Sequence, residues 1–465
     1  MAIRESLALN EDQRALQDTL RAFLTDQLSF AELRRSLDGE TGYSPELHAR
    51  MAAELGLCGL TIPEQFGGLG LSQVEASVVH TELGRTLYPG PFLSSWLATG
   101  ALLAAGDSAA AERWLPSLAD GTVTGTVAAA DRDGHWSPKI AGVWAERSIP
   151  GWQLRGRRWY VVAGHTADLF VVPAVIGSRP AMFLVEPGSP GLTVSRQVSL
   201  DLTRRVSIVT FDATPARLLG EDADGAAALA RAEQEFLLAT TAEAVGGISW
   251  CLDASIAYVR DRERFGRPIG SFQAEADSCA EMIGHLQSVS SVARYAAVAT
   301  ADDAPDAPIV AHIAALRAGE SYRAVTEAAT HLFGGIGFAR EHDAQLYYRR
   351  AWSVERLAGG PQAHREVIAD LADQLSGPAP GRSTRARYVR RHMTSADPDH
   401  REAPHGRCAA APRMLPAGVQ RPGDRNTAET SGESGPVRRH ARNRYAGCVP
   451  NARLEGRRRG RIAQW

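Results

Sequence analysis

Apolar positions recur with a helical period through the first part of the chain. Between residues 11 and 30 the apolar side chains are spaced by three and four positions, at Leu16, Leu20, Phe23 and Leu24. This spacing is typical of an amphipathic helix. Pro45, directly after Ser44, predicts the first turn of a second helix. Three further helical patterns follow at 72–87, 92–105 and 108–119. We therefore expect residues 1–120 to form a helical domain.

From about residue 122 the pattern changes to short runs of β-branched and aromatic residues separated by Gly and Pro. Such runs between turn residues predict strands. The strand candidates are 159–162, 169–172, 181–185 and 206–211. We expect residues 121–222 to form a β domain, either a barrel or a sandwich.

Long helical patterns return after residue 223. They cover 225–262, 272–300, 308–332 and 344–375. Four long helices with short connections predict an antiparallel bundle, here over residues 223–377. The expected fold class is therefore α+β, with the β domain between two helical domains.

The last segment, 378–465, differs in composition from the rest. It holds 19 arginines against seven acidic residues and few aliphatic ones. A segment of this kind cannot bury enough apolar surface to offset the entropy of ordering, so we expect a disordered tail. Its charge also fits an arm for nucleic acid or another anionic surface. Its composition also fits the translation of GC-rich DNA without a selected fold, and we favour this or inert disorder over a binding arm.

The composition of the whole chain excludes several classes of protein. The chain has 465 residues, a formal net charge of −2 and 44% hydrophobic residues. A wholly basic nucleic-acid binder is excluded, and no apolar run reaches the roughly 18 residues that a membrane span needs. The N-terminus is polar and predicts no signal peptide, and the five cysteines show no metal spacing. We expect a cytoplasmic protein without metal, nucleic acid or membrane partners.

Several short motifs occur in a fixed order along residues 10–375. They are the loop Pro63–Gly70 (PEQFGGLG), the segment Arg262–Gln273 (RERFGRPIGSFQ) and the segment Gly334–Phe338 (GGIGF). The segments 200–205 (LDLTRR) and 341–350 accompany them. In this order and spacing the motifs resemble those of the acyl-CoA dehydrogenase family, in an actinobacterial branch.

This resemblance implies an FAD cofactor held between the β domain, the C-terminal bundle and a neighbouring subunit. It places Arg262 at the pyrophosphate, where a guanidinium can form charge-assisted bonds. It places Phe265 and Gln273 at the adenosine end, and Gly334 and Gly335 where the backbone approaches the cofactor closely. His331 falls where the family often has a Gln at FAD, and Gln362 is also expected at the cofactor. Solvated arginine, core aromatic and helix-stop roles are the structural alternatives.

The expected flavin-ring site in the β domain matches the family only in part. Tyr160 falls at an aromatic position and can cover a ring face. Val162 falls where the family has a small hydroxyl residue, so only its backbone N–H remains for the flavin. The family's Thr-Glu-Pro segment is not recognisable in 128–134 (AAADRDG).

The carboxylate that removes the substrate's α-proton is missing from both positions that the family uses. Ala358 occupies the usual Glu position, and Phe236 occupies the second position, on the first long C-terminal helix. Neither side chain can accept a proton. Glu235, Glu243 and Glu355 are weak remaining candidates for the base, and a solvated helix stripe is the alternative for Glu235 and Glu243.

The resemblance implies FAD-dependent α,β-dehydrogenation of an acyl thioester, carried by CoA or by a carrier protein. Three arrangements remain open. The chain is a subunit of a hetero-oligomer whose partner supplies the Glu, or an oxidoreductase with a displaced base, or a non-catalytic subunit that binds acyl thioesters or acts as a scaffold. The family also implies an electron-transfer flavoprotein as acceptor and a homo- or hetero-oligomeric assembly.

Overall fold

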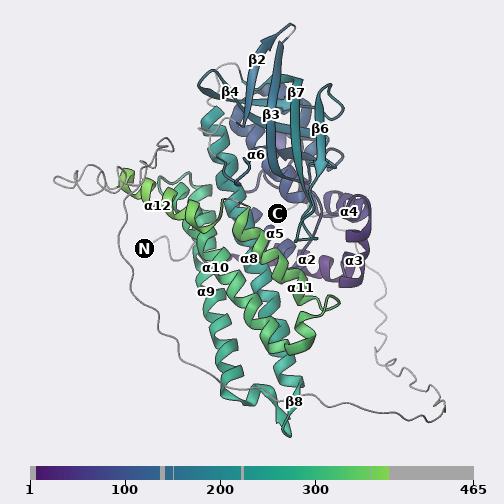
Figure 1. Cartoon of the computed structure of the whole chain (residues 1–465), viewed down its shortest axis with the longest axis vertical. Helices are drawn as coiled ribbons and strands as arrows, with labels where there is room; N and C mark the ends of the chain where they lie inside the picture. The colour runs from purple at the N-terminus through teal and green to yellow at the C-terminus, as the bar shows by residue number, and fades with distance from the viewer. Residues whose placement is uncertain (1–6, 137–141, 150, 221–224, 358, 376–465) are drawn as a thin grey trace, which may run out of the picture. The chain divides into compact units, whose positions relative to one another are not determined.

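The computed structural model describes residues 7–136, 142–149, 151–220, 225–357 and 359–375. The tail expected over 378–465, like Ala358, lies outside the described residues. Within them the chain runs through helices, then a β barrel, then helices again (Figure 1). The expected α+β class and the order of its three parts are confirmed.

The N-terminal part consists of six α-helices and two short 3₁₀ turns among its described residues. The helices are α2 (Glu11–Gln27), α3 (Phe30–Asp38), α4 (Pro45–Leu55), α5 (Gln73–Arg85), α6 (Phe92–Ala105) and α7 (Ser108–Ala119), and the turns are η1 (Leu57–Gly59) and η2 (Glu64–Phe66). Asn10 and Gln13 form a capping box at the start of α2, which satisfies two backbone donors reciprocally. The pattern over 11–30 thus contains one helix and the start of α3, which Ser29 caps.

The β domain is a single sheet that closes on itself. Its strands are β1 (Gly125–Val127), β2 (Val143–Ser148), β3 (Gly151–Val162), β4 (Leu169–Ile176), β5 (Arg179–Val185), β6 (Leu192–Arg196) and β7 (Val206–Leu218). The path β1-β4-β2-β3-β7-β5 is closed because β5 also pairs with β4. All four expected strands are present. β3 is longer than expected, because its first part, 151–158 (GWQLRGRR), lacks a run of β-branched residues, and two register shifts interrupt its pairing with β7.

The C-terminal part is built on three long helices, α8 (Gly225–Asp261), α9 (Gln273–Ala301) and α10 (Ala307–Phe333). The short hairpin of β8 (Glu263–Arg264) and β9 (Arg267–Pro268) and the turn η3 (Ile269–Ser271) join α8 to α9, and η4 (Gly334–Phe338) follows α10. The expectation of a single fourth helix over 344–375 is wrong. The structure has α11 (Ala344–Arg356) and α12 (Gly360–Leu375) instead. Gly359 and Gly360, with φ of 88° and 81°, break the helix, a conformation that glycine adopts without steric cost.

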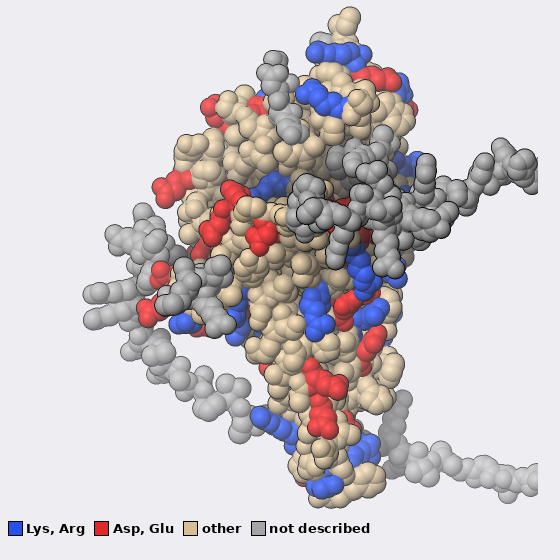
Figure 2. Space-filling model, turned by 90° about the vertical axis from the view of Figure 1, so that its left-hand side faces the viewer, with Lys and Arg blue, Asp and Glu red and all other residues tan. Residues whose placement is uncertain are grey.

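The surface carries both signs of charge. In the view of Figure 2, blue and red side chains are interspersed over the described part, so neither sign forms a continuous field there. No helix among the described residues is long and apolar enough to span a membrane.

Candidate functional site

The hairpin between α8 and α9 carries the expected pyrophosphate and adenosine residues. The Arg262 N–H donates to the Tyr258 carbonyl at 2.8 Å, and the Arg262 carbonyl accepts from Ile269 N–H at 2.8 Å. These bonds fix the base of the hairpin to the end of α8. Phe265 stands in the turn with a φ of 53° and is 94% exposed. Figure 1 shows this hairpin at the end of α8 away from the barrel.

The start of α9 and the end of α10 lie at the same end of the bundle. The Tyr258 hydroxyl donates to the Phe333 carbonyl at 3.4 Å, and the two rings meet edge to face at 5.1 Å. Gly334 follows with a φ of 65°. The structure thus gathers the expected cofactor residues of the bundle at one end, namely Arg262, Phe265, Gln273, His331, Gly334 and Gly335. Apart from the half-buried Gly334, these residues are exposed.

The expected flavin-ring residues lie on the barrel, apart from the hairpin (Figure 1). Tyr160 has a φ of 51°, which the second register shift of β3 accommodates. Its N–H donates to Gln197 Oε1 at 3.3 Å and its hydroxyl to the Arg132 carbonyl at 3.2 Å. The Val162 carbonyl accepts from the Thr126 hydroxyl at 2.7 Å. Gln362 lies on α12 and donates to Glu366 at 2.8 Å.

Such a division fits the cofactor that the resemblance implies. At the bundle end, Arg262 supplies hydrogen-bond donors and Phe265 an apolar face, and Gly334 has a positive φ. A dinucleotide needs such donors and such a face. A Cβ built on Gly334 or Gly335 would meet no atom within 4 Å, so this surface is open in one chain. The barrel supplies a second surface with a tyrosine ring. One chain alone does not bring the two surfaces together.

The second expected base position is filled by aromatic packing. Phe236 on α8 is 1% exposed, and its ring stacks on Trp136 with centroids 4.8 Å apart and an angle of 14°. Trp136 belongs to the loop that follows β1. That loop also contacts the turn between α11 and α12, because a Cβ built on Gly134 would lie 3.3 Å from the Arg356 carbonyl.

Glu235, the first candidate base, is sealed between three helices. It is 2% exposed, and its Oε1 accepts from Arg231 at 2.9 Å and from Gln73 at 3.1 Å. Its Oε2 has no partner and faces Gly100, where a Cβ would lie only 1.8 Å away. Burial raises the pKa of Glu235 to about 7. The carboxyl can change its charge near neutral pH but has no space beside it for a substrate.

Glu243, the second candidate, is the centre of a buried ion network. Its Oε2 contacts Arg204 and lies 3.1 Å from Arg350. Arg350 in turn pairs with Asp201 at 2.8 Å. Burial opposes the charge, but the neighbouring Arg204, with His80 and Arg350 close by, lowers the pKa of Glu243 to about 2. This carboxylate stays ionised and links the loop of residues 201–205 to α8 and α11.

Glu355, the third candidate, faces α10. It is 6% exposed and lies 3.4 Å from Arg323. Its side chain also packs on Gly319, where a Cβ would lie 3.2 Å from Glu355 Cγ. The structure therefore does not bring the three candidate carboxylates together, and each has a packed or paired environment of its own.

The structure also reveals residues that the motifs did not single out. Asp131 and His135 lie in the loop after β1, with Asp131 Oδ2 3.8 Å from His135 Nδ1. Burial raises the pKa of Glu233, one turn before Phe236 on α8, to about 7. In the sequence, Asp131 and His135 are marked only by their spacing of four residues, in the segment that departs from the family pattern.

Comparison with known proteins shows to which family the chain belongs. The acyl-CoA dehydrogenase N-terminal domain model matches residues 10–122, and the model of its C-terminal domain matches residues 230–372. The acyl-CoA dehydrogenase IpdE2 of Mycolicibacterium smegmatis is 32% identical over 357 residues, which cover 76% of this chain and 96% of that protein. The chain belongs to the acyl-CoA dehydrogenase family.

Other relatives agree with this assignment. The acyl-CoA dehydrogenase IpdE2 of Mycobacterium tuberculosis is 31% identical, with 78% of this chain and 98% of that protein covered. Among solved structures, the ChsE4-ChsE5 complex from Mycobacterium tuberculosis matches with a TM-score of 0.73 and 28% identity, over 80% of this chain and 100% of that chain. The acyl-CoA dehydrogenase fold and an oxidoreductase activity of this family follow, and the expected family is confirmed.

Proposed function

We propose that the chain binds FAD and takes part in the α,β-dehydrogenation of an acyl-CoA thioester. The observation that carries this proposal is the gathering of Arg262, Phe265 and Gly334 at one end of a bundle of this family. FAD, when bound, supplies the acceptor for the β-hydride. Arg262 would hold the pyrophosphate, Phe265 would cover the adenosine end, and Tyr160 on the barrel would lie beside the flavin ring.

Assembly is part of the proposal, because the two surfaces lie on different parts of one chain. A neighbouring subunit would bring its own bundle end toward this barrel. The electrons would then pass from the reduced flavin to an electron-transfer flavoprotein. Carriage of the acyl group by CoA, as opposed to a carrier protein, is supported by the relatives, whose names describe acyl-CoA dehydrogenases.

The test of the cofactor is a matched pair of arginine variants. Arg262→Met should lower the FAD content of the purified protein severalfold, because a charge-assisted bond to the pyrophosphate is lost. Arg264→Met changes an exposed neighbour in the same hairpin and should leave the content unchanged. Flavin is counted by absorbance against protein and identified by chromatography. Equal loss in both variants, or a colourless wild-type protein, would contradict the proposal.

A second arrangement, in which a partner subunit supplies the base, is favoured by the solved relatives. One is the ChsE4-ChsE5 complex, and another is the Tcur3481-Tcur3483 steroid acyl-CoA dehydrogenase, with 28% identity and a TM-score of 0.71 over 79% of this chain and 99% of that one. Each of these names joins two different components. By analogy, this chain would contribute FAD contacts while the carboxylate that Ala358 and Phe236 lack comes from a different chain.

Installing the missing carboxylate tests whether position 358 is the deficient one. Ala358→Glu should raise the rate of anaerobic flavin reduction by a panel of acyl-CoAs, and Ala358→Gln, of nearly equal size, should not. A general base contributes about 10²- to 10⁴-fold. If the Glu and Gln variants reduce flavin at the same rate in the purified protein, the account based on position 358 fails.

A further inference from the structure

One short loop, residues 131–136, contacts Phe236 and Gly359, the residue that follows Ala358 in the sequence. Trp136 stacks on Phe236. Its neighbour His135 lies against the turn that follows residue 358, because a Cβ built on Gly359 would be 2.5 Å from His135 Cδ2 and 3.0 Å from Nε2. The imidazole edge that carries Nε2 therefore points at the turn where the family places its carboxylate.

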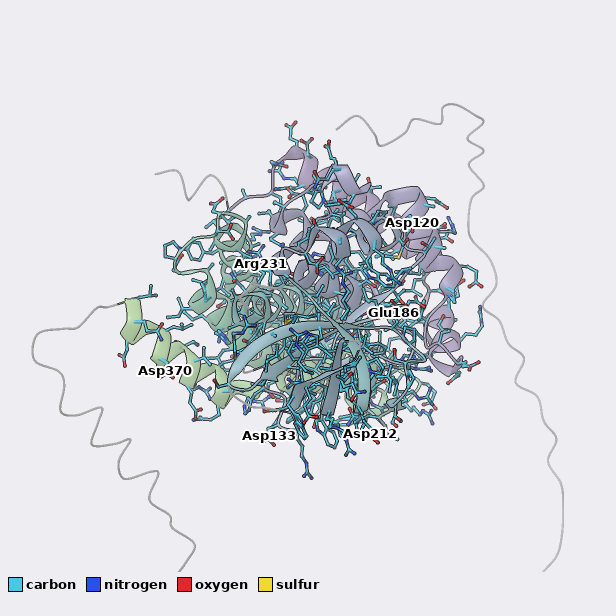
Figure 3. All side chains as sticks on the ribbon, turned by 90° about the horizontal axis from the view of Figure 1, so that it is seen from above. Asp120, Asp133, Glu186, Asp212, Arg231 and Asp370 are labelled. Atoms are coloured by element: carbon cyan, nitrogen blue, oxygen red, sulfur yellow. The ribbon has the colours of Figure 1, made fainter. Side chains whose placement is uncertain are left out.

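Asp131 holds this loop in shape. Its Oδ1 accepts the N–H groups of Asp133 and His135, both at 2.9 Å. The Asp131 N–H donates to the His135 carbonyl at 3.0 Å. Asp131 is 8% exposed, whereas Asp133 points outward, beside Asp212 at the margin of the barrel (Figure 3). The buried carboxylate thus fixes the position of His135 through the backbone.

The same carboxylate faces the imidazole. Asp131 Oδ2 lies 3.8 Å from His135 Nδ1, a separation longer than a hydrogen bond but within the range of an ion pair once the ring is protonated. A carboxylate beside one ring nitrogen favours the proton on that nitrogen. Nε2 is then the nitrogen with a free lone pair, on the edge that meets the turn.

We propose that His135 Nε2 accepts the α-proton of the acyl thioester, with Asp131 as its positioning residue. This inference rests on the proposed dehydrogenation and places its base within the chain itself, as the alternative to a base that a partner subunit supplies. The α C–H bond breaks and its proton goes to Nε2. The bonding pair forms the α,β double bond as the β-hydrogen leaves with its electrons to the flavin. The thioester loses two electrons and the flavin gains them, while Asp131 balances the charge of the imidazolium.

The other acidic groups nearby are less suited to this step. Glu235 is 2% exposed and has Gly100 against its free oxygen, and two arginines occupy the Glu243 carboxylate, which is also buried. His135 is half-buried, with 38% of its side chain exposed, so a substrate can reach it.

Proton exchange tests this step separately from flavin reduction. The probe is 3-thiaoctanoyl-CoA, whose sulfur replaces the β-carbon, so that it can lose an α-proton but no hydride. The full-length protein is incubated with the probe in D2O, and NMR follows the loss of the α-proton signal. His135→Gln should slow the exchange about 100-fold or more, with FAD content and probe affinity unchanged. His135→Glu should recover part of the rate.

Asp133→Asn is the matched control in the same loop, because this side chain points outward, and it should exchange at the wild-type rate. Asp131→Asn should slow the exchange with FAD content and probe affinity unchanged, because the carboxylate that fixes His135 is lost, and Asp131→Glu should recover part of the rate. A purely structural role for Asp131 would lower the FAD content and the probe affinity as well. Wild-type exchange in His135→Gln, or no exchange by a wild-type protein that binds the probe, overturns the assignment. Loss of FAD from the wild-type protein contradicts the proposed function instead, and the exchange rate still decides on His135.

Discussion

The indole of Trp136 stacks on the ring of Phe236, with centroids 4.8 Å apart and planes 14° from parallel. One ring comes from the loop after β1 and the other from α8, so the contact ties the barrel to the helical bundle. It also occupies the place on α8 where the family resemblance led us to expect a second base position. The pair therefore contributes packing at a position where a base was expected.

Removing one ring of this pair should destabilise the fold strongly. Phe236→Ala should lower the free energy of unfolding by about 3–5 kcal/mol, because a fully buried aromatic ring leaves a cavity and loses its stacking partner. Urea unfolding followed by Trp fluorescence measures the difference. Phe338→Ala, at a ring that is 72% exposed, should change the unfolding free energy by less than about 0.5 kcal/mol. Similar losses in both variants would show that the ring pair adds no particular stability.

The buried ion network predicts a large effect at one of two adjacent arginines. Arg350→Met should cost about 3–5 kcal/mol, because Asp201 and Glu243 remain buried with part of their compensation gone. Arg349→Met alters a half-buried arginine on the same helix and should change stability by less than about 1 kcal/mol. The measurement is again the free energy of unfolding, obtained from urea unfolding. An Arg350→Met protein as stable as the Arg349→Met protein would contradict this view of the network.

A pair of histidines should make stability depend on pH. His312 on α10 and His364 on α12 face each other with their Nδ1 atoms 3.0 Å apart. Burial lowers the pKa of each to about 4, below the value of roughly 6.5 of an unfolded chain. The unfolded state therefore binds protons first as the pH falls. The stabilising contribution is complete above about pH 6.5 and is lost between there and pH 4.

Replacing both histidines checks this dependence. In His312→Leu/His364→Leu the unfolding free energy should fall less between pH 7 and pH 4.5 than in the wild type. Hydrogen exchange of the α12 amides should show the same difference, since His364 lies on that helix. An identical pH dependence in the wild type and the double variant would exclude the pair as its source.

Much of the fold could be predicted because its elements carry strong local signals. The period of apolar residues and the capping residue Ser44 predicted helices close to those observed, and the β-branched runs predicted four of the strands. The break between α11 and α12 was missed although Gly359, Gly360 and Pro361 mark it, because helical spacing is present both before and after these residues. The shortest strands were missed as well, because three residues such as those of β1 contain no periodicity.

The candidate site was predictable only where short motifs carry it. Arg262, Phe265 and Gly334 could be named in advance because their spacing is fixed within the hairpin and η4. Asp131 and His135 could not, because the loop that holds them departs from the family's pattern. Their significance depends on contacts with Gly359 and, through Trp136, with Phe236, which lie far along the chain. Only a folded structure shows such contacts.

The hairpin of β8 and β9 projects a phenylalanine almost wholly into water. Burying this ring is favourable only when another surface covers it, and the proposed cofactor would cover it together with a second chain. Binding of the flavin would then depend on the concentration of the protein, because the site is complete only in the assembly. Dilution of the protein should release the cofactor as the assembly separates, so the yellow colour would report on association as much as on affinity.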